Sequence, residues 1–248
     1  MNLLFDIGNT RVKVAREEDG SLQSLPSISS TVETAFPPDW ESKVPDAIYL
    51  ASVANDEINH RVCQWANDRW QLDVKTIAVQ QDLAGIHTRY EKPETLGVDR
   101  WLAALGAYHI ECGQGICVID AGTALTVDVV DNNGVHHGGL IAPGLELMIR
   151  SLTNNTAQLA LENISVPDIF AVDTQTAISL GCADYVAGMI QRATERIAKQ
   201  ELRITKWYVT GGQGALVEKL ALRELNIEMR NMPDLVLQGI AIVAKHQA

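Results

Sequence analysis

The sequence predicts an α/β protein made of two similar domains that flank a cleft. Three observations carry this prediction. One short motif occurs twice about half a chain apart, and β-prone runs alternate with helical patterns along the 248 residues. Hydrophobic residues make up 46% of the chain and charged residues 21%, which is typical of a folded globular protein. A chain of this length can bury one large core or two cores of about 120 residues each.

The repeated motif is an apolar strand that ends in Asp-x-Gly, followed by a polar turn with threonine and a second β-prone run. The first copy covers residues 3–14 and the second covers residues 117–127. Each copy predicts a β-hairpin with glycine at the bend, where a positive φ or a close backbone approach is needed. Asp6 and Asp120 are 114 positions apart, counted from 6 to 120. One Asp-Gly turn is common, but two copies with matched flanks favour duplication of a domain.

The remaining elements follow in order along the chain. In the first half we expect a strand at 47–53, a helix with Asn55 as its N-cap, a strand at 73–79 and a helix from Asp99 to about Glu111. In the second half we expect a long helix at 182–201, a strand at 206–210 and a final helix at 235–246. No Pro/Gly/Ser-rich linker divides the halves, so we place the domains at 1–113 and 114–248.

Charge and composition exclude several classes of function. The formal net charge is −11 and no Lys/Arg cluster suggests a basic groove, so the sequence argues against a nucleic-acid partner. The N-terminus does not resemble a signal peptide, and the longest apolar stretches, such as 235–244, are too short to span a bilayer. The four cysteines have no metal-binding spacing and predict buried free thiols in a reducing compartment. We therefore expect a cytoplasmic protein.

The two hairpins present groups suited to a nucleotide triphosphate. Each combines a carboxylate at a strand end with backbone N–H groups in a turn; amides can cradle phosphate oxygens, and carboxylates hold the cations that neutralise them. Hydroxyl groups come from Thr10, Thr123 and Thr126. Phosphoryl transfer depends mainly on positioning and charge stabilisation, so this set predicts a phosphotransferase. The spacing of Lys13 fits a phosphate contact and a solvated strand-edge lysine equally well.

Two further glycine-rich segments accompany the hairpins. The strand–Gly–Gly–helix pattern at 208–214 suits the adenosine part of a nucleotide, and the sequence contains no P-loop motif. Gly138–Gly144 predicts a tightly packed corner between a strand and a helix. His136 and His137 precede this corner and would point to opposite sides of a strand, which argues against a shared metal site.

The segment 96–100 allows two interpretations of one carboxylate. Asp99 opens a predicted helix, where an acidic residue is favoured by the helix dipole. Alternatively, Asp99 is a general base and Arg100 grips an anionic substrate. The residues alone favour the first interpretation.

Five motifs, taken in order, resemble those of type III pantothenate kinases: Asp6–Lys13, Leu96–Arg100, Asp120–Thr123, Gly138–Gly144 and Thr210–Gly212. The resemblance runs from residue 1 to about residue 240. It implies the duplicated actin-like (ribonuclease H-like) ATPase core of the acetate and sugar kinase/actin superfamily, in a homodimer. It also implies ATP-dependent phosphorylation of pantothenate to 4′-phosphopantothenate, the first step of coenzyme A biosynthesis, with Mg²⁺ and either K⁺ or NH₄⁺ as cofactors.

The resemblance assigns roles position by position. ATP-binding residues are Asp6, Ile7, Gly8, Asn9, Thr10, Arg11, Val12, Lys13 and Thr123. Pantothenate-binding residues are Tyr90, Gly97, Val98, Asp99, Arg100 and Thr174. Asp99 becomes the catalytic proton acceptor, which reverses the preference stated above; Asp120 would hold the monovalent cation and Asp6 the divalent metal, through the phosphates. Around Thr174 the sequence departs from the family pattern of Gly-basic-Asn-Thr before Ala-Ile-x-x-Gly, and Thr176 competes for the same role.

Two other functions are compatible with this fold. One is phosphorylation of another small hydroxylated metabolite. The other is a non-catalytic accessory or regulatory role, as sequences of this kind have been labelled transcriptional accessory factors. Asp6, Asp99 and Asp120 are all present, which favours an enzyme, and the net charge of −11 argues against direct DNA binding.

Overall fold

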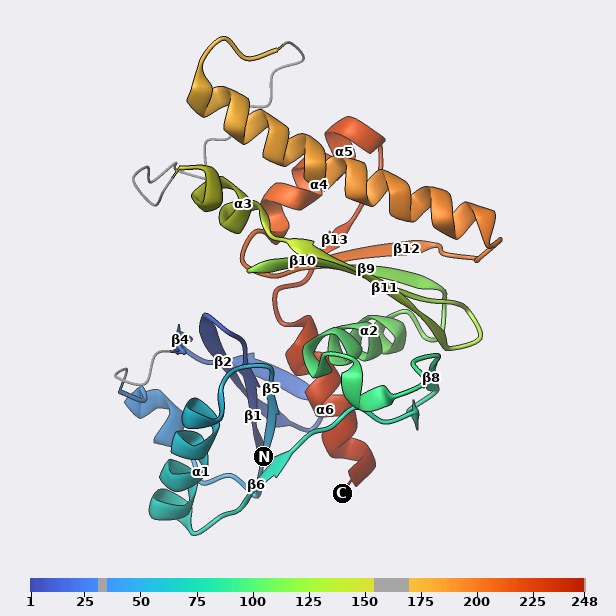
Figure 1. The fold of residues 1–248 in the computed structure, drawn as a ribbon. Helices are drawn as coiled ribbons and strands as arrows, with labels where there is room; N and C mark the ends of the chain where they lie inside the picture. Colours follow the sequence, from blue (N-terminus) through green and yellow to red (C-terminus); the bar gives the residue numbers. More distant parts are fainter. Residues whose placement is uncertain (31–34, 154–169, 248) are drawn as a thin grey trace. The chain divides into compact units, whose positions relative to one another are not determined.

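The computed structural model describes residues 1–30, 35–153 and 170–247, and the chain forms two compact units (Figure 1). The first comprises Met1–Gly113, Gly134–His136 and Asp234–Ala248, and the second comprises Gln114–Asn133 and His137–Pro233. The chain first passes from one unit to the other between Gly113 and Gln114, and the sequence places the domains at 1–113 and 114–248. The C-terminal helix differs from that expectation: it belongs to the first unit, because it packs against a helix there.

The first unit contains a mixed sheet and three α-helices. Its sheet runs in the order β3-β2-β1-β5-β6, with β4 paired to β2. The strands are β1 (Asn2–Ile7), β2 (Arg11–Glu18), β3 (Ser21–Ser24), β4 (Ile28–Ser29), β5 (Ala47–Ser52) and β6 (Val74–Thr76). The helices are α1 (Asp56–Trp70), α2 (Val98–Ile110) and α6 (Leu235–Gln247), with 3₁₀ turns at Pro38–Glu41 and Pro93–Thr95. A small hairpin, β7 (Asp82–Leu83) and β8 (Ile86–Thr88), pairs with Val135 and His136.

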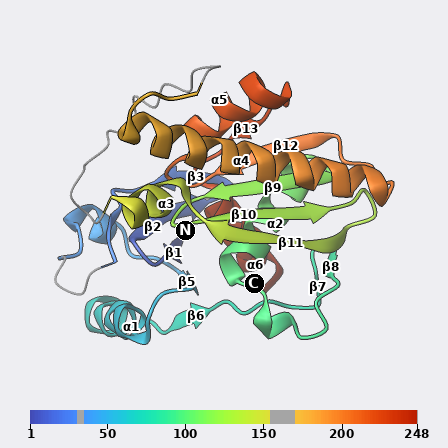
Figure 2. The same cartoon turned by 45° about the horizontal axis from the view of Figure 1, so that its top comes forward.

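The second unit repeats the same strand order. Its sheet runs β13-β12-β9-β10-β11, and Figure 2 shows β9 beside β10. The strands are β9 (Ile116–Ala121), β10 (Ala124–Val130), β11 (Val135–Pro143), β12 (Lys206–Thr210) and β13 (Arg230–Asn231); the first two residues of β11 belong to the first unit. The helices are α3 (Leu145–Leu152), α4 (Thr174–Lys199) and α5 (Gly214–Leu225). Strand β1 is antiparallel to β2 and parallel to β5, and strand β9 is likewise antiparallel to β10 and parallel to β12, so the predicted duplication is confirmed.

The two repeats also bury their strands with the same alternation. Leu3, Phe5 and Ile7 belong to the apolar cluster that includes residues of α1. Cys117, Ile119 and Ala121 belong to the cluster that includes residues of α3, α4 and α5. Successive side chains of a strand point to opposite faces, so Asp6 and Asp120 each point away from the cluster of their own unit.

Helices α2 and α6 of the first unit pack with their backbones close together. A Cβ atom on Gly106 would lie 2.5 Å from the carbonyl oxygen of Leu235. A Cβ atom on Gly239 would lie 2.1 Å from the carbonyl oxygen of Leu102. Both distances are far below van der Waals contact, so this pairing requires glycine at both positions. Helix α6 also contacts β1 and β5, which links the C-terminus to the sheet that carries the first hairpin.

Most helix predictions are confirmed, with one large difference in length. Asn55 is the N-cap of α1, and its side chain accepts a hydrogen bond from the Ile58 amide at 3.4 Å. Helix α4 begins at Thr174, well before the predicted start at residue 182. The reason is a cap: the carboxylate of Asp173 accepts a hydrogen bond from the Thr176 amide at 2.9 Å.

The cysteines are all free thiols, but they are not all buried. Cys117 and Cys182 are buried and Cys63 is partly buried, whereas Cys112 is exposed. The prediction of burial is therefore wrong for Cys112, which lies in the turn after α2 with a φ of 51°. Burial raises the pKa of the Cys117 thiol well above its usual range. None of the helices in the described ranges combines the length and apolar character that a membrane crossing needs.

Candidate active site

The first hairpin turn connects β1 to β2 and is held by hydrogen bonds at its base and its tip. The Gly8 amide donates to the Arg11 carbonyl at 2.9 Å. The Ser30 hydroxyl donates to the Asn9 carbonyl at 2.7 Å, and the Ser30 amide donates to the Thr10 carbonyl at 3.2 Å. Three turn carbonyls are thereby engaged, so the turn has a fixed backbone that can present its amides to a ligand.

Asp6 and Lys13 are cross-strand neighbours next to this turn. They are directly paired in the ladder between β1 and β2, which places both side chains on the same face of the sheet. Asp6 is 9% exposed and Lys13 is half-buried. Strand β2 lies between β1 on one side and β3 and β4 on the other, so it is not an edge strand of the sheet.

The second hairpin turn, between β9 and β10, packs against the start of α3. The Gly122 amide donates to the Ala124 carbonyl at 3.0 Å, and the Gly144 amide donates to the Thr123 carbonyl at 2.9 Å. A Cβ atom on Gly144 would lie 2.2 Å from the Gly122 carbonyl oxygen, which confirms the tight corner predicted for this segment. Thr123 is exposed at the tip.

The predicted reason for glycine in the hairpin turns is wrong in both copies. Neither Gly8 nor Gly122 has a positive φ. The closest neighbours of an added Cβ would be at 3.5 Å for Gly8 and 3.4 Å for Gly122, which is ordinary contact. The backbone of the protein alone therefore requires glycine at neither position.

Asp120 lies against a glycine from the end of β12. Gly211 has a φ of +88°, and a Cβ atom there would lie 2.4 Å from Oδ1 of Asp120 and 2.5 Å from the Ala121 carbonyl oxygen. The absence of a side chain at Gly211 leaves a carboxylate and a carbonyl oxygen next to bare backbone. Oxygen donors of this kind suit a hard cation such as K⁺ or Mg²⁺. No group of three or more His, Cys, Asp or Glu side chains in the described ranges is arranged to hold a metal.

The residues predicted to bind pantothenate gather at the start of α2. Gly97 is the N-cap, and a Cβ atom there would lie 2.7 Å from Oδ1 of Asp99. The same oxygen accepts a hydrogen bond from the Arg100 amide at 2.8 Å. Arg100 is 7% exposed, and its Nη1 donates to the hydroxyl of Tyr90 at 3.2 Å. The structure therefore brings Tyr90, Gly97, Asp99 and Arg100 together, and the side chain of Val98 between them is buried.

Thr174 lies apart from this cluster in the chain, at the first residue of α4, and is exposed. Thr176 follows in the same turn, and its amide is bound by the Asp173 carboxylate. Hydrogen bonds from the amide and then the hydroxyl of Thr176 lower the pKa of Asp173. Both threonines therefore lie in the first turn of α4.

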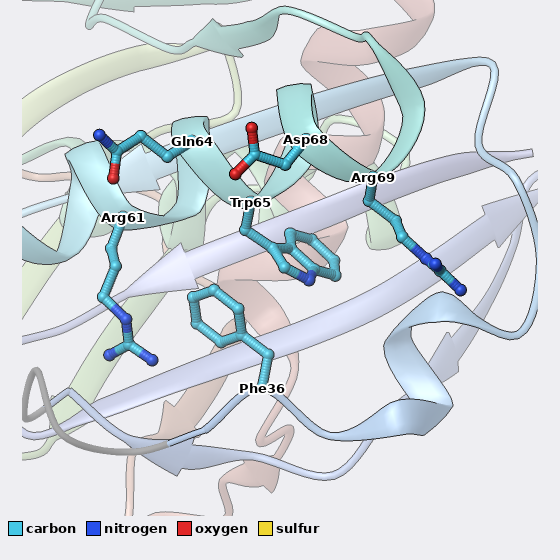
Figure 3. A pocket seen from close by; sticks show the side chains of 6 residues that line it. All are labelled: Phe36, Arg61, Gln64, Trp65, Asp68 and Arg69. Atoms are coloured by element: carbon cyan, nitrogen blue, oxygen red, sulfur yellow. The ribbon is translucent and has the colours of Figure 1, made fainter.

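A pocket of about 360 Å³ lies over α1 in the first unit (Figure 3). The guanidinium of Arg61 covers the ring of Phe36 at 4.6 Å, and Trp65 lies beside that ring. Arg69 is paired with Glu41 at 2.9 Å. The lining contains none of the residues predicted to bind ATP or pantothenate, so we assign this pocket no part in phosphoryl transfer.

Two features of the site were not predicted from the sequence. The strand–Gly–Gly pattern at 208–214 predicts a close backbone approach at Gly211 but does not identify Asp120 as the residue that Gly211 contacts. No pattern in the sequence indicates the contacts of Thr88 and His136 with Tyr90. Neither residue belongs to a motif, and 48 positions separate them.

Comparisons with known proteins agree on one family. A family model described as type III pantothenate kinase matches residues 2–196. A type III pantothenate kinase from Nitrosococcus oceani is 32% identical over 99% of this chain and 94% of that protein. One from Marinomonas sp. is 34% identical over 99% of this chain and 95% of that protein.

Solved structures agree on the fold. A protein from Campylobacter jejuni described as a Baf family transcriptional activator has a TM-score of 0.61 at 21% identity, covering 99% of this chain and 98% of that one. The activator of 2-hydroxyisocaproyl-CoA dehydratase from Clostridium difficile, with bound ADPNP, has a TM-score of 0.59 at 15% identity and covers 99% and 94%. At these identities the likeness concerns the fold alone, which is the predicted actin-like ATPase core. The family model and the full-length relatives above 30% identity show that this chain belongs to the type III pantothenate kinase family.

Proposed function

We infer that the protein transfers the γ-phosphoryl group of ATP to pantothenate, giving 4′-phosphopantothenate and ADP in the first step of coenzyme A biosynthesis. The observation that carries this inference is family membership over nearly the whole chain. In the reaction, the primary hydroxyl oxygen of pantothenate forms a bond to the γ-phosphorus. The bond from that phosphorus to the β–γ bridging oxygen breaks, and ADP leaves with the bonding electrons.

The cluster at the start of α2 supports a binding site for pantothenate. We propose that the Asp99 carboxylate takes the proton of the attacking hydroxyl as general base. The Arg100 guanidinium would bind the pantothenate carboxylate, since a planar fork of N–H donors matches two carboxylate oxygens. Tyr90 already binds that guanidinium and would fix its orientation, and Gly97 leaves room beside Asp99. We assign Thr174 to this site on the family resemblance alone.

The two hairpins support the binding of ATP. We propose that Gly8, Asn9, Thr10 and Arg11 contact the phosphates, with Lys13 adding a positive charge and Thr123 a hydroxyl. The side chains of Ile7 and Val12 are fully buried, so any contact of theirs with ATP must use the backbone. A divalent cation, which we propose is Mg²⁺, neutralises phosphate charge when bound, and Asp6 would hold it through the phosphates.

Asp120 is our candidate for the monovalent cation site, occupied by K⁺ or NH₄⁺. The support is its oxygen donor set: a carboxylate beside the Ala121 carbonyl, with the backbone of Gly211 packed against both. Tight sites for divalent cations typically contain several anionic ligands, whereas this site contains one carboxylate, which matches the charge of a monovalent ion.

We further propose that the enzyme is a cytoplasmic homodimer. The second unit exposes several large apolar side chains, which are candidates for burial against a second copy: Ile141, Leu147, Leu152, Phe170, Val172 and Tyr185. The four free thiols are compatible with a reducing compartment. Sedimentation should give twice the 27.1 kDa mass of one chain, and a monomer at micromolar concentration would contradict the dimer.

The activity is tested by a substrate panel. Purified protein is incubated with ATP, MgCl₂ and KCl, together with pantothenate or one of several other hydroxylated metabolites, and ADP formation is followed in a coupled assay. We expect ADP formation above background with pantothenate. Turnover of a different metabolite alone would identify another small-molecule kinase, and no turnover with any compound would favour the accessory role.

A further inference from the structure

The ring of Tyr90 stacks against that of His136, a buried histidine to which we have assigned no function. The rings of Tyr90 and His136 are stacked, with centroids 6.0 Å apart and planes inclined by 8°. His136 is 0% exposed and lies at the start of β11, where it pairs with Thr88 of β8 in the ladder. The Arg89 amide, next to Tyr90, donates to the His136 carbonyl at 3.1 Å. The backbone before Tyr90 and the ring beneath it are therefore both held by β11.

The Thr88 hydroxyl joins the same group. Its oxygen lies 3.0 Å from Nδ1 of His136, a hydrogen bond between two fully buried side chains. It also accepts a hydrogen bond from the Tyr90 amide at 3.3 Å. At the far end of the ring, the Tyr90 hydroxyl accepts from Arg100. A continuous set of contacts thus runs from Thr88 and His136 through Tyr90 to the guanidinium.

We propose that His136 is a positioning residue for pantothenate: it holds the Tyr90 ring so that the Tyr90 hydroxyl keeps the Arg100 guanidinium aligned with the substrate carboxylate. The proposal rests on the proposed function, since it assumes that Tyr90 and Arg100 bind pantothenate. The direction of a tyrosine hydroxyl is set by only two side-chain torsions, and a stacked ring restrains both. Bidentate binding of a carboxylate depends strongly on the orientation of the guanidinium.

The chemistry of this position favours a role beyond filling space. An apolar side chain would pack here without placing polar nitrogen atoms in the interior. A buried imidazole requires a hydrogen-bond partner, and Thr88 supplies one. Its neighbour His137 is paired with Asp131 at 2.9 Å, whereas His136 is bonded to Thr88, so the two adjacent histidines bond to different groups.

The test is a double-mutant cycle between His136 and Tyr90, with KM for pantothenate, KM for ATP and kcat measured for each variant. His136→Leu should raise the pantothenate KM about tenfold, the scale of one lost ring contact and one lost buried hydrogen bond. Its kcat and ATP KM should stay within about twofold of wild type, because uniform binding is lost rather than transition-state stabilisation. In a Tyr90→Ala background, His136→Leu should cause no further rise.

Two more variants separate positioning from folding. His136→Phe keeps a ring next to Tyr90 and should restore most of the affinity for pantothenate that His136→Leu loses. If His136→Leu does not fold, Thr88→Val replaces it in the test: it removes the hydroxyl that binds His136 and should raise the pantothenate KM. His137→Leu is the matched control: it breaks the partly buried contact of the neighbouring histidine with Asp131, and it should lower the melting temperature without changing the pantothenate KM.

The outcomes distinguish this proposal from the function on which it rests. If Tyr90→Ala leaves the pantothenate KM unchanged, the assigned substrate site is wrong and the role of His136 fails with it. If Tyr90→Ala raises this KM but folded His136→Leu does not, the positioning role alone is wrong. If His136→Leu raised the pantothenate KM equally in the wild-type and Tyr90→Ala backgrounds, the positioning role would also be wrong, because His136 would then act independently of Tyr90.

Discussion

At the residue scale, neighbouring side chains at the start of α2 have different surroundings. Asp99 is partly exposed and its carboxylate faces the bare Cα of Gly97, whereas Arg100 is nearly buried and bonded to Tyr90. A proton acceptor has to reach the substrate hydroxyl, and a carboxylate-binding guanidinium has to be held still. Replacing Asp99 and replacing Arg100 should therefore change different kinetic constants.

We predict that Asp99→Asn lowers kcat by about 10²–10⁴-fold, because asparagine keeps the shape but cannot take the proton. The ATP KM should change little, since we propose that the hairpins, and not Asp99, bind ATP. Arg100→Ala should instead mainly raise the pantothenate KM. If Asp99 served only the helix dipole, its loss would cost about 0.3–1 kcal/mol of stability and leave turnover intact. Steady-state kinetics and a melting curve on the same Asp99→Asn sample separate these results.

Asp120 gives a second prediction at this scale. Wild-type turnover should be higher in KCl or NH₄Cl than in NaCl, and Asp120→Asn should reduce that difference, because the neutral amide attracts a cation less strongly. Asp82→Asn, which changes an exposed carboxylate elsewhere, should respond to the salts as wild type does. Equal wild-type turnover in all three salts would remove the reason for a cation site at Asp120.

At the scale of elements, local patterns predicted most of the fold and long-range contacts could not be predicted. The Asp-x-Gly motifs located both hairpins, and Asn55 located the start of α1, because turns and caps are made by neighbours in sequence. The predicted start of α4 at residue 182 is wrong because the Asp173 cap begins the helix at Thr174. The contact of Gly211 with Asp120 joins strands 91 positions apart, from 120 to 211, and no local pattern encodes it.

The α2–α6 pairing allows a stability test at this scale. Gly239→Ala places a methyl group where the Leu102 carbonyl now lies, and the overpacking should destabilise the protein by about 1–3 kcal/mol or more. Gly188 in α4 is the matched control, since nothing lies within 4 Å of its added Cβ. Gly188→Ala should be neutral or stabilise the protein by about 0.5–1 kcal/mol, because alanine has the higher helix propensity. Urea denaturation of both variants checks the difference, and an equal effect would contradict the close helix packing.

The cap of α4 predicts a pH dependence. Hydrogen bonds from Thr176 lower the pKa of Asp173 below its ordinary value of 3.8, so its contribution to stability is present above that value. The contribution is lost as the pH falls through the lowered pKa. The melting temperature of Asp173→Ala should therefore lie below that of wild type at pH 7, with a smaller gap near pH 3. A gap that stays constant with pH would show that the charge of Asp173 does not stabilise the cap.

At the scale of the whole molecule, two short repeats were enough to predict the architecture. Asp6 and Asp120 stand at equivalent places in sheets of the same strand order, and that symmetry could be predicted from the spacing of the hairpins. The position of α6 in the first unit could not be predicted from the sequence, because the apolar pattern of this helix does not specify which helix it packs against. Composition and motifs indicated a phosphotransferase, while pantothenate as substrate came from the resemblance of the ordered motifs as a set.

The central claim is that this chain phosphorylates pantothenate, and the most direct measurement follows the phosphoryl group itself. The protein is incubated with pantothenate, MgCl₂ and ATP labelled at the γ-phosphorus, in KCl, NH₄Cl or NaCl, and the products are separated and identified by mass. We expect the label in 4′-phosphopantothenate in KCl or NH₄Cl, with transfer by Asp99→Asn reduced about 10²–10⁴-fold. Label that remains in ATP or appears only as inorganic phosphate in all three salts would contradict the claim.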